Sequence, residues 1–214
     1  MFFGLSTGKR PKSLQFNNLP SRHNGTGFKL DAMLRKLVTL AATIGLAAPQ
    51  VALAQSSTKA SDDSAVLPLI DELRSKDLLL PVPGVDSKSL KDTFFQKRGT
   101  QRVHRALDIV APRNTPVLST DSGTIIKLFT SKAGGLTVYA ADANRRFIYY
   151  YAHLERYRSG LQEGMKLARG DTIGFVGTSG NAPPNYPHLH FAIMRSYNVQ
   201  KWSKGLPINP AKVF

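Results

Sequence analysis

The sequence predicts a mainly β protein, a mostly antiparallel sandwich or barrel preceded by one short helix. Short runs rich in Val, Ile, Tyr and Phe recur from Val103 onward, with turn residues between them. The chain has 214 residues and 42% hydrophobic residues, enough for one domain with a real core and terminal extensions. It contains no cysteine, which excludes disulfides and thiolate metal sites.

Residues 33–54 have the pattern of an export signal. Arg35 and Lys36 precede an apolar run over residues 37–48, and residues 52–54 read Ala-Leu-Ala, a small–x–small cleavage pattern. The run is shorter than the roughly 20 apolar residues of a membrane span. A buried hydrophobic helix or an uncleaved anchor is the alternative. We expect an exported protein, periplasmic or extracellular, with no stable membrane span after signal cleavage.

The segment before this signal is polar, basic and without periodicity. Because a signal peptide normally stands at the start of a chain, we hypothesise that translation begins at Met33 and that residues 1–32 are a mis-called start. Residues 55–64 read as a polar linker. Apolar positions between Ala65 and Leu80 suit a short helix, which Pro81 and Pro83 are expected to end. The main domain is assigned to residues 81–214.

The expected strands follow in chain order. Alternating or β-branched runs lie at residues 115–119, 123–129, 136–140, 146–153, 171–176 and 188–194. Asp121-Ser-Gly is a turn signal, and Asp142-Ala-Asn-Arg between two strands indicates a hairpin. The long segment 177–187 leads into the last strand and is typical of a loop that walls a binding cleft.

The net charge of +15 is high for a chain of this length. From Gln55 onward, 22 Lys and Arg stand against 13 Asp and Glu, so the main body is itself basic. A basic surface attracts anionic polymers, including nucleic acid, acidic lipid and anionic cell-wall material. No nucleic-acid-binding motif accompanies the charge, so no nucleic acid partner is expected.

Two histidine motifs have the spacing of a metal site. His188 and His190 share one face of a strand, while Leu189 and residues 191 and 193 share the opposite, core-like face. His104 and Asp108, four residues apart, share a face in either a strand or a helix. Two histidines and one aspartate supply three ligands for a catalytic zinc, and the remaining histidines are then available for proton transfer. A lone histidine is more often a hydrogen-bonded structural residue, but both motifs together favour a metal site.

Three ordered motifs resemble the lysostaphin-type, or LytM-like, zinc endopeptidases that act on peptidoglycan. They are Arg102-Val-His104-Arg-Ala-Leu-Asp108, Tyr151-Ala-His153-Leu and His188-Leu-His190-Phe. The similarity extends from about Leu80 to Phe214 and includes the terminal Ile208-Asn-Pro210. Ala106 and the pair Phe94-Phe95 depart from residues common in the family, at positions that carry no metal.

The resemblance implies two packed antiparallel sheets, a β-sandwich or barrel-sandwich hybrid, with the site in a groove between loops. One Zn²⁺ per chain is expected on His104, Asp108 and His190, with His153 and His188 as the catalytic pair. Residues 81–214 would be the zinc metallopeptidase domain. Its substrate would be a crosslink or stem peptide of bacterial peptidoglycan, and a monomer is expected.

Several alternatives remain beside this interpretation. A non-catalytic regulator or activator of wall hydrolases shares the fold, although the intact ligand set argues against it. The segment Arg169-Gly-Asp-Thr-Ile-Gly suggests a biotin- or lipoyl-carrier-like barrel. The sequence has no hairpin with a lysine to be modified in the expected apolar setting, which argues against this alternative. A further alternative is a sound site that the helix at residues 65–80 and the preceding linker shield in the resting protein. For the groove itself we predict Tyr151, Asn181 and Tyr186, although core packing is the favoured role for Tyr151.

Overall fold

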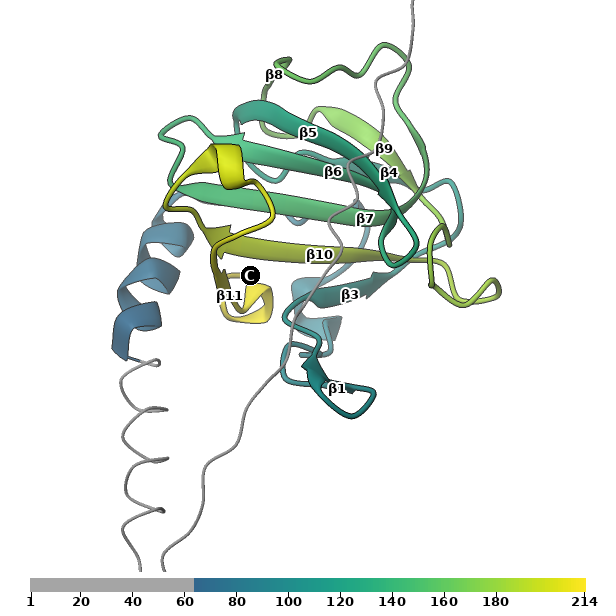
Figure 1. The fold of residues 1–214 in the computed structure, drawn as a ribbon, viewed down its shortest axis with the longest axis horizontal. Coiled ribbons are helices and arrows are strands. Elements are labelled where there is room, and N and C mark those ends of the chain that lie inside the picture. Colours follow the sequence, from purple (N-terminus) through teal and green to yellow (C-terminus); the bar gives the residue numbers. More distant parts are fainter. Residues whose placement is uncertain (1–63) are drawn as a thin grey trace, which may run out of the picture. The chain divides into compact units, whose positions relative to one another are not determined.

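A computed structural model describes residues 64–214 of the chain (Figure 1). The predicted leader, signal peptide and nearly all of the predicted linker lie outside these residues. Within the described part, no helix has both the length and the apolar character needed to cross a membrane.

The described chain is mainly β. Its strands are β1 (Lys97–Arg98), β2 (Arg102–Val103), β3 (Leu107–Val110), β4 (Pro116–Leu118), β5 (Gly123–Ser131), β6 (Gly135–Asp142), β7 (Phe147–Tyr157), β8 (Lys166–Leu167), β9 (Thr172–Val176), β10 (His188–Arg195) and β11 (Leu206–Ile208). Three short 3₁₀ helices are η1 (Ser87–Ser89), η2 (Val199–Lys201) and η3 (Pro210–Lys212). Each of the six expected strands overlaps one of these strands, with boundaries that differ by a few residues.

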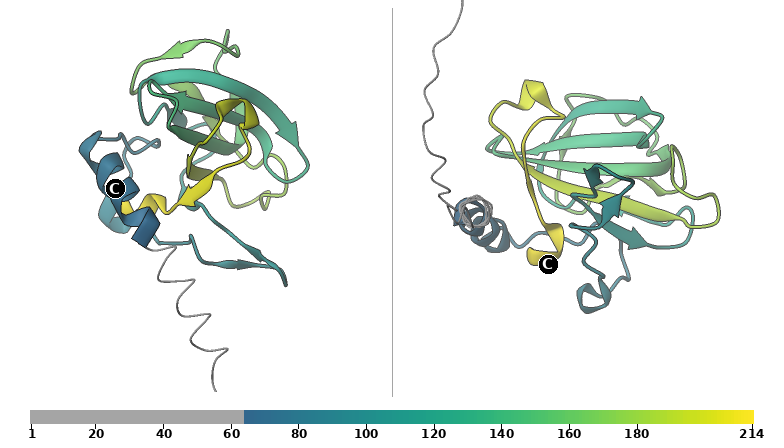
Figure 2. Two further views of the ribbon diagram at one scale, coloured as in Figure 1. Left: turned by 60° about the vertical axis from the view of Figure 1, so that its left-hand side comes forward. Right: turned by 60° about the horizontal axis from the view of Figure 1, so that its bottom comes forward.

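All strand pairs among the described residues are antiparallel, as expected. Strands β3 to β11 form one sheet, with the order β11-β10-β7-β6-β5-β8 and with β3, β4 and β9 joined at its sides. Strands β1 and β2 form a separate hairpin, which projects from the sheet in Figures 1 and 2.

Strand β7 shares one of its edges between two partners. Residues 147–152 pair with β10, and residues 154–157 pair with β9. The register with β6 on the other edge also shifts at this point, so β7 carries a bulge around His153, whose φ is 60°. The loop between β9 and β10 therefore starts and ends close to His153, where β7 changes from one partner strand to the other.

The core lies on one face of this sheet. Leu189, Phe191 and Ile193 of β10 are fully buried, which confirms the predicted alternation of that strand. Tyr149 and Tyr151 of β7 join them with at most 1% of their surface exposed. Burying side chains of this size stabilises the fold by about 1.5–3 kcal/mol each.

The N-terminal helix is present but shorter than expected. Residues 64–75 are helical, with Ile70 and Leu73 buried in the core. The predicted extension to Leu80 is wrong, because Asp77 adopts a left-handed φ of 50° and ends the helical path. The chain then becomes extended, and Leu79 N donates to Thr120 O. This tertiary hydrogen bond takes the place of the helical one that the leucine spacing predicts.

The predicted hairpin turn joins β6 to β7. The carboxylate Oδ1 of Asp142 accepts hydrogen bonds from Arg146 N at 2.7 Å and Phe147 N at 2.9 Å. Arg145 completes the turn with a φ of 55°. A buried aspartate thus satisfies the amides of the turn, which fixes where β7 begins.

Candidate metal centre

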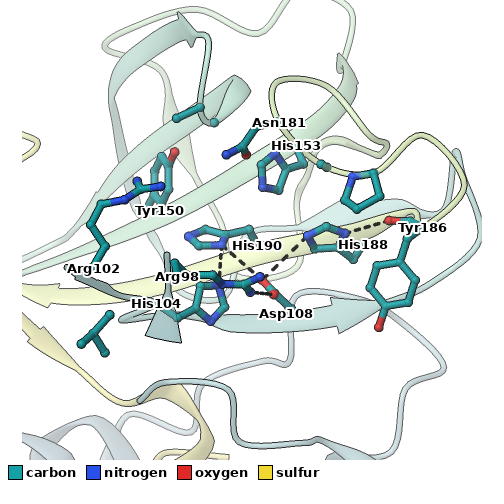
Figure 3. Close-up of a pocket in the computed structure, with 15 residues that line it drawn as sticks. Arg98, Arg102, His104, Asp108, Tyr150, His153, Asn181, Tyr186, His188 and His190 are labelled. Atoms are coloured by element: carbon teal, nitrogen blue, oxygen red, sulfur yellow. Dashed lines mark hydrogen bonds and ion pairs between the residues drawn. The ribbon is translucent and has the colours of Figure 1, made fainter. Parts of the chain in front are cut away.

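Three potential ligand atoms meet beside β3 and β10 (Figure 3). His104 Nε2 lies 3.0 Å from Asp108 Oδ1 and 2.9 Å from His190 Nδ1, and His190 Nδ1 lies 3.2 Å from the same Asp108 oxygen. The fold therefore brings the two predicted motifs together, although Asp108 and His190 are 82 residues apart in the chain.

Strand register places two of these residues. His190 of β10 lies directly opposite Asp108 of β3. Directly opposite side chains in an antiparallel pair lie on the same face with Cβ atoms about 4.5–5.5 Å apart. His104 reaches the site differently. It stands before β3, and Arg105, with a φ of 59°, turns the chain between the two residues. The four-residue spacing therefore spans a turn and not one regular element.

Thr93 orients both residues of the first motif. Its carbonyl oxygen accepts a hydrogen bond from His104 Nδ1 at 3.0 Å, which turns Nε2 toward the centre. Its hydroxyl accepts from Asp108 N at 3.2 Å. Asp92 in turn accepts a 2.9 Å hydrogen bond from the buried Asn209 at the start of η3. Sequence analysis missed Thr93, because no motif marks it.

The donor set fits zinc. Ligand atoms around a tetrahedral zinc with bonds of about 2.0–2.1 Å lie about 3.3 Å apart, close to the three distances observed here. Burial opposes ionisation of Asp108, but hydrogen bonds from His104 and His190 hold the pKa of its carboxyl far below the usual range. Burial lowers the pKa of His190, which favours its neutral form. An ionised carboxylate and neutral imidazoles are the forms that bind a metal.

Two further histidines face the same centre. His153 Nδ1 donates to Ser179 O and His188 Nδ1 donates to Tyr186 O, both at 2.8 Å. A carbonyl oxygen can only accept, so each ring has a proton on Nδ1, and in the neutral imidazole Nε2 is then the unprotonated nitrogen. His188 Nε2 lies 3.8 Å from Asp108 Oδ1. The ring centroids of His153 and His188 lie 5.0 Å apart. Burial lowers the pKa of His153 to about 4, so this imidazole is neutral near pH 7.

The bulge in β7 decides which side chains face the cavity. Regular alternation predicts that Tyr151 and His153 share a face, but the left-handed φ of His153 breaks that alternation. Tyr151 is fully buried in the core, where its hydroxyl accepts a hydrogen bond from Thr120 N. The prediction of Tyr151 as a groove residue is therefore wrong. Its neighbour Tyr150 lines the cavity beside His153.

The cavity around the histidines has a volume of about 490 Å³. Asn181 and Tyr186, the other two predicted groove residues, line it, and their contact with substrate stays a prediction. Arg98 and Arg102 also line it, and sequence analysis missed both. No described residue before Arg98 is among the lining residues, so the helix at 64–75 leaves the cavity uncovered.

Ser179 fixes the loop that enters β10. Besides the bond from His153 to its carbonyl, its hydroxyl donates to Leu154 O at 2.7 Å and accepts from Leu136 N at 2.9 Å. A Cβ on the next residue, Gly180, would lie 2.3 Å from Gly135 N, so the loop packs directly against the β5–β6 turn. These contacts hold the carbonyl that orients His153.

Comparison with known proteins identifies a peptidase family and relatives within it. The model of Peptidase family M23 matches residues 102–210. The L-Ala--D-Glu endopeptidase of Bacillus subtilis is 32% identical over 130 residues, covering 58% of this chain and 40% of that protein. The peptidoglycan DD-endopeptidase ShyC of Vibrio cholerae is 32% identical over 115 residues, covering 51% of this chain and 25% of that protein. The chain thus matches less than half the length of either relative.

A solved structure supports the fold. A putative glycyl-glycine endopeptidase lytM from Ruminococcus gnavus superimposes with a TM-score of 0.50 at 25% identity. The match covers 64% of this chain and 57% of that one.

Proposed function

Since this chain belongs to peptidase family M23, we propose that it is an exported, zinc-dependent endopeptidase that hydrolyses peptide crosslinks or stem peptides of bacterial peptidoglycan. The observation that supports this most directly is the convergence of His104, Asp108 and His190 with two oriented histidines in one cavity. Relatives whose names refer to peptidoglycan or to L-Ala–D-Glu bonds support the choice of substrate.

His104, Asp108 and His190 would hold the zinc through Nε2, Oδ1 and Nδ1. When bound, zinc supplies a Lewis acid that polarises the scissile carbonyl and lowers the pKa of a water molecule. Thr93 keeps two of these ligands in place before metal arrives, because it binds His104 through its carbonyl and Asp108 through its hydroxyl.

His153 and His188 would act as the general base and general acid of the hydrolysis. Each ring donates from Nδ1 to a carbonyl, so in the neutral imidazole Nε2 is free to accept a proton from an attacking water. Once protonated, the same nitrogen donates a hydrogen bond to a developing oxyanion or to the leaving amine. The backbone carbonyls of Ser179 and Tyr186 stabilise either ring as an imidazolium, since they continue to accept from Nδ1.

Export is proposed from the sequence pattern alone. Residues 33–54 would be removed as a signal peptide, and the mature chain would begin at Gln55 with residues 81–214 as its catalytic part. N-terminal sequencing of the precursor and of the mature protein tests both boundaries. A precursor peptide covering residues 9–29 would contradict a start at Met33.

The central test measures metal content and wall digestion together on protein beginning at Gln55. We expect about one zinc per chain and release of soluble peptides from purified walls. His190→Ala should lose both, while Tyr197→Ala, a change at an exposed aromatic residue, should lose neither. Zinc without peptide release from several walls would favour the regulatory alternative, and absence of zinc would refute the metal centre.

A further inference from the structure

Two arginines line the cavity from a part of the fold that the proposed chemistry does not use. In the β1–β2 hairpin, Arg98 lies directly opposite Arg102. Side chains in that relation have Cβ atoms about 4.5–5.5 Å apart, so both guanidinium groups can reach one ligand. The hairpin turn passes through Gly99, whose φ of 69° suits glycine.

The pairing of Arg98 with Arg102 does not itself stabilise the hairpin, and only Arg98 has an acidic partner, Asp108, among the described residues. Like charges directly opposite one another destabilise a hairpin. Both strands of the hairpin are exposed along their whole length, so no core contact offsets the repulsion. An unfavourable pairing at the rim of a cavity is instead typical of a site whose stabilising partner is a bound anion.

Charge is unevenly distributed around the cavity. Asp108 is the one acidic residue among its lining residues, and its Oδ2 accepts a 2.5 Å hydrogen bond from Arg98 Nη2. Within the described part of the chain, Arg102 has no acidic partner. Guanidinium has five N–H donors, so Arg98 retains donors for a second acceptor while it holds Asp108. The hairpin side of the cavity is therefore positive and has donors to spare.

On the basis of the function proposed above, we propose that Arg98 and Arg102 form a subsite that binds a carboxylate of the peptide substrate and thereby selects acidic wall peptides. Arginine is suited to this role because its planar fork matches a carboxylate with two parallel hydrogen bonds. The pair would position the substrate and take no part in proton transfer.

The position of the pair fits a peptide that crosses the site. Figure 3 shows Arg102 and Tyr186 on opposite sides of the histidine cluster. A cavity of about 490 Å³ is of ordinary size for a ligand site, within the range of roughly 300–1,000 Å³. A peptide with its scissile bond over the histidines would extend toward both sides, and a residue close to that bond would meet Arg102.

The test uses the full chain loaded with zinc and two synthetic wall peptides that differ at one group. Both contain a D-glutamyl residue, which has a free carboxylate in one peptide and a carboxamide in the other. We expect the unaltered protein to cleave the acidic peptide with the higher kcat/KM. Arg102→Gln should lower that value roughly tenfold to a hundredfold, the range for losing hydrogen bonds to a charged group, and leave the amide peptide nearly unchanged.

Lys97→Gln is the matched control. Lys97 lies on the same hairpin and is equally exposed, but it does not line the cavity. Its replacement makes the same change in net charge and should leave both peptides unaffected. Equal losses on both peptides, or a similar loss in Lys97→Gln, would overturn the subsite in favour of a general charge effect or a structural role. Cleavage by the unaltered protein without preference for the acidic peptide would also overturn it.

A binding measurement separates this proposal from the proposed function. In a zinc-loaded His153→Gln background, which is expected to stop cleavage, the Kd for the acidic peptide should rise at least tenfold on adding Arg102→Gln. If the unaltered protein cleaves neither the peptides nor purified wall, the proposed function fails. Arginine-dependent binding of the acidic peptide would then still establish the subsite, and binding that ignores Arg102 would refute it.

Discussion

His153 and His188 are held in the same way, because each donates its Nδ1 proton to a backbone carbonyl. Neither belongs to the group of three that can hold the metal. We therefore expect His153→Ala and His188→Ala each to keep about one zinc per chain while kcat falls roughly 10²- to 10⁴-fold, the usual contribution of a positioned general acid or base. Zinc analysis beside wall digestion checks this. Loss of zinc from either variant would mean that the residue supports the metal instead.

The lowered pKa of His153 predicts a pH-dependent stability of the metal-free protein. Burial holds this pKa at about 4, below the value of about 6.5 in an unfolded chain. Between these values the unfolded state binds more protons, so the free energy of unfolding should fall as the pH drops from about 6.5 to 4. Urea titrations at pH 7 and pH 5 measure the difference, on the order of 1–3 kcal/mol. His153→Gln should reduce it, and an unchanged difference would contradict the assigned shift.

Thr93 provides a test of ligand orientation. Thr93→Val removes the hydroxyl that binds Asp108 N but retains the carbonyl that binds His104. We expect zinc affinity to fall roughly 10- to 100-fold, the usual range for partners that orient metal ligands. Competition with a chelator measures it. Thr93→Ser keeps the hydroxyl and should bind zinc nearly as tightly as the unaltered protein. Equal zinc affinity in all three proteins would show that the Thr93 hydroxyl does not orient the ligands.

Neighbouring tyrosines on β7 should respond in opposite ways. Tyr151→Phe leaves the buried Thr120 N–H without its partner, which costs about 1–3 kcal/mol of stability. Activity should be unchanged, because Tyr151 lies in the core. Tyr150→Phe alters a residue that lines the cavity and should reduce kcat/KM more than stability. Thermal unfolding and peptide cleavage on both variants distinguish the two roles, and an activity loss confined to Tyr151→Phe would contradict the assignment.

Much of the site follows from local spacing in the sequence. His188 and His190 lie on the face predicted by alternation, because the strand is regular and its opposite face consists of large apolar residues. Their convergence with Asp108 also follows, since β10 pairs with β3 in register. The predicted roles in metal binding and catalysis stay predictions until metal and turnover are measured.

Other features depend on contacts that local sequence does not encode. The helix stops before Leu78 because an extended path offers a hydrogen bond to Thr120, more than 40 residues away. His153 leaves the face of Tyr151 because β7 changes partner from β10 to β9 at that residue. Thr93 orients His104 through a carbonyl that every residue type possesses, so its identity gives no signal. In each case the decisive partner is distant in the sequence.

The bulge in β7 also determines where this chain can change its length. From Tyr151 to Leu154, three steps of β7 lie opposite the two steps of β6 from Val138 to Leu136, so the bulge holds one residue more than a regular strand. A residue added or removed in the regular part of β7, between Phe147 and Tyr151, would reverse the face of every residue beyond it, so Tyr151 would leave the core and the pairing with β9 would slip. The surface turn after β7 passes through exposed residues such as Gly160, and an added residue there disturbs neither face. Insertions and deletions should therefore be tolerated in that turn and should abolish activity in the regular part of β7.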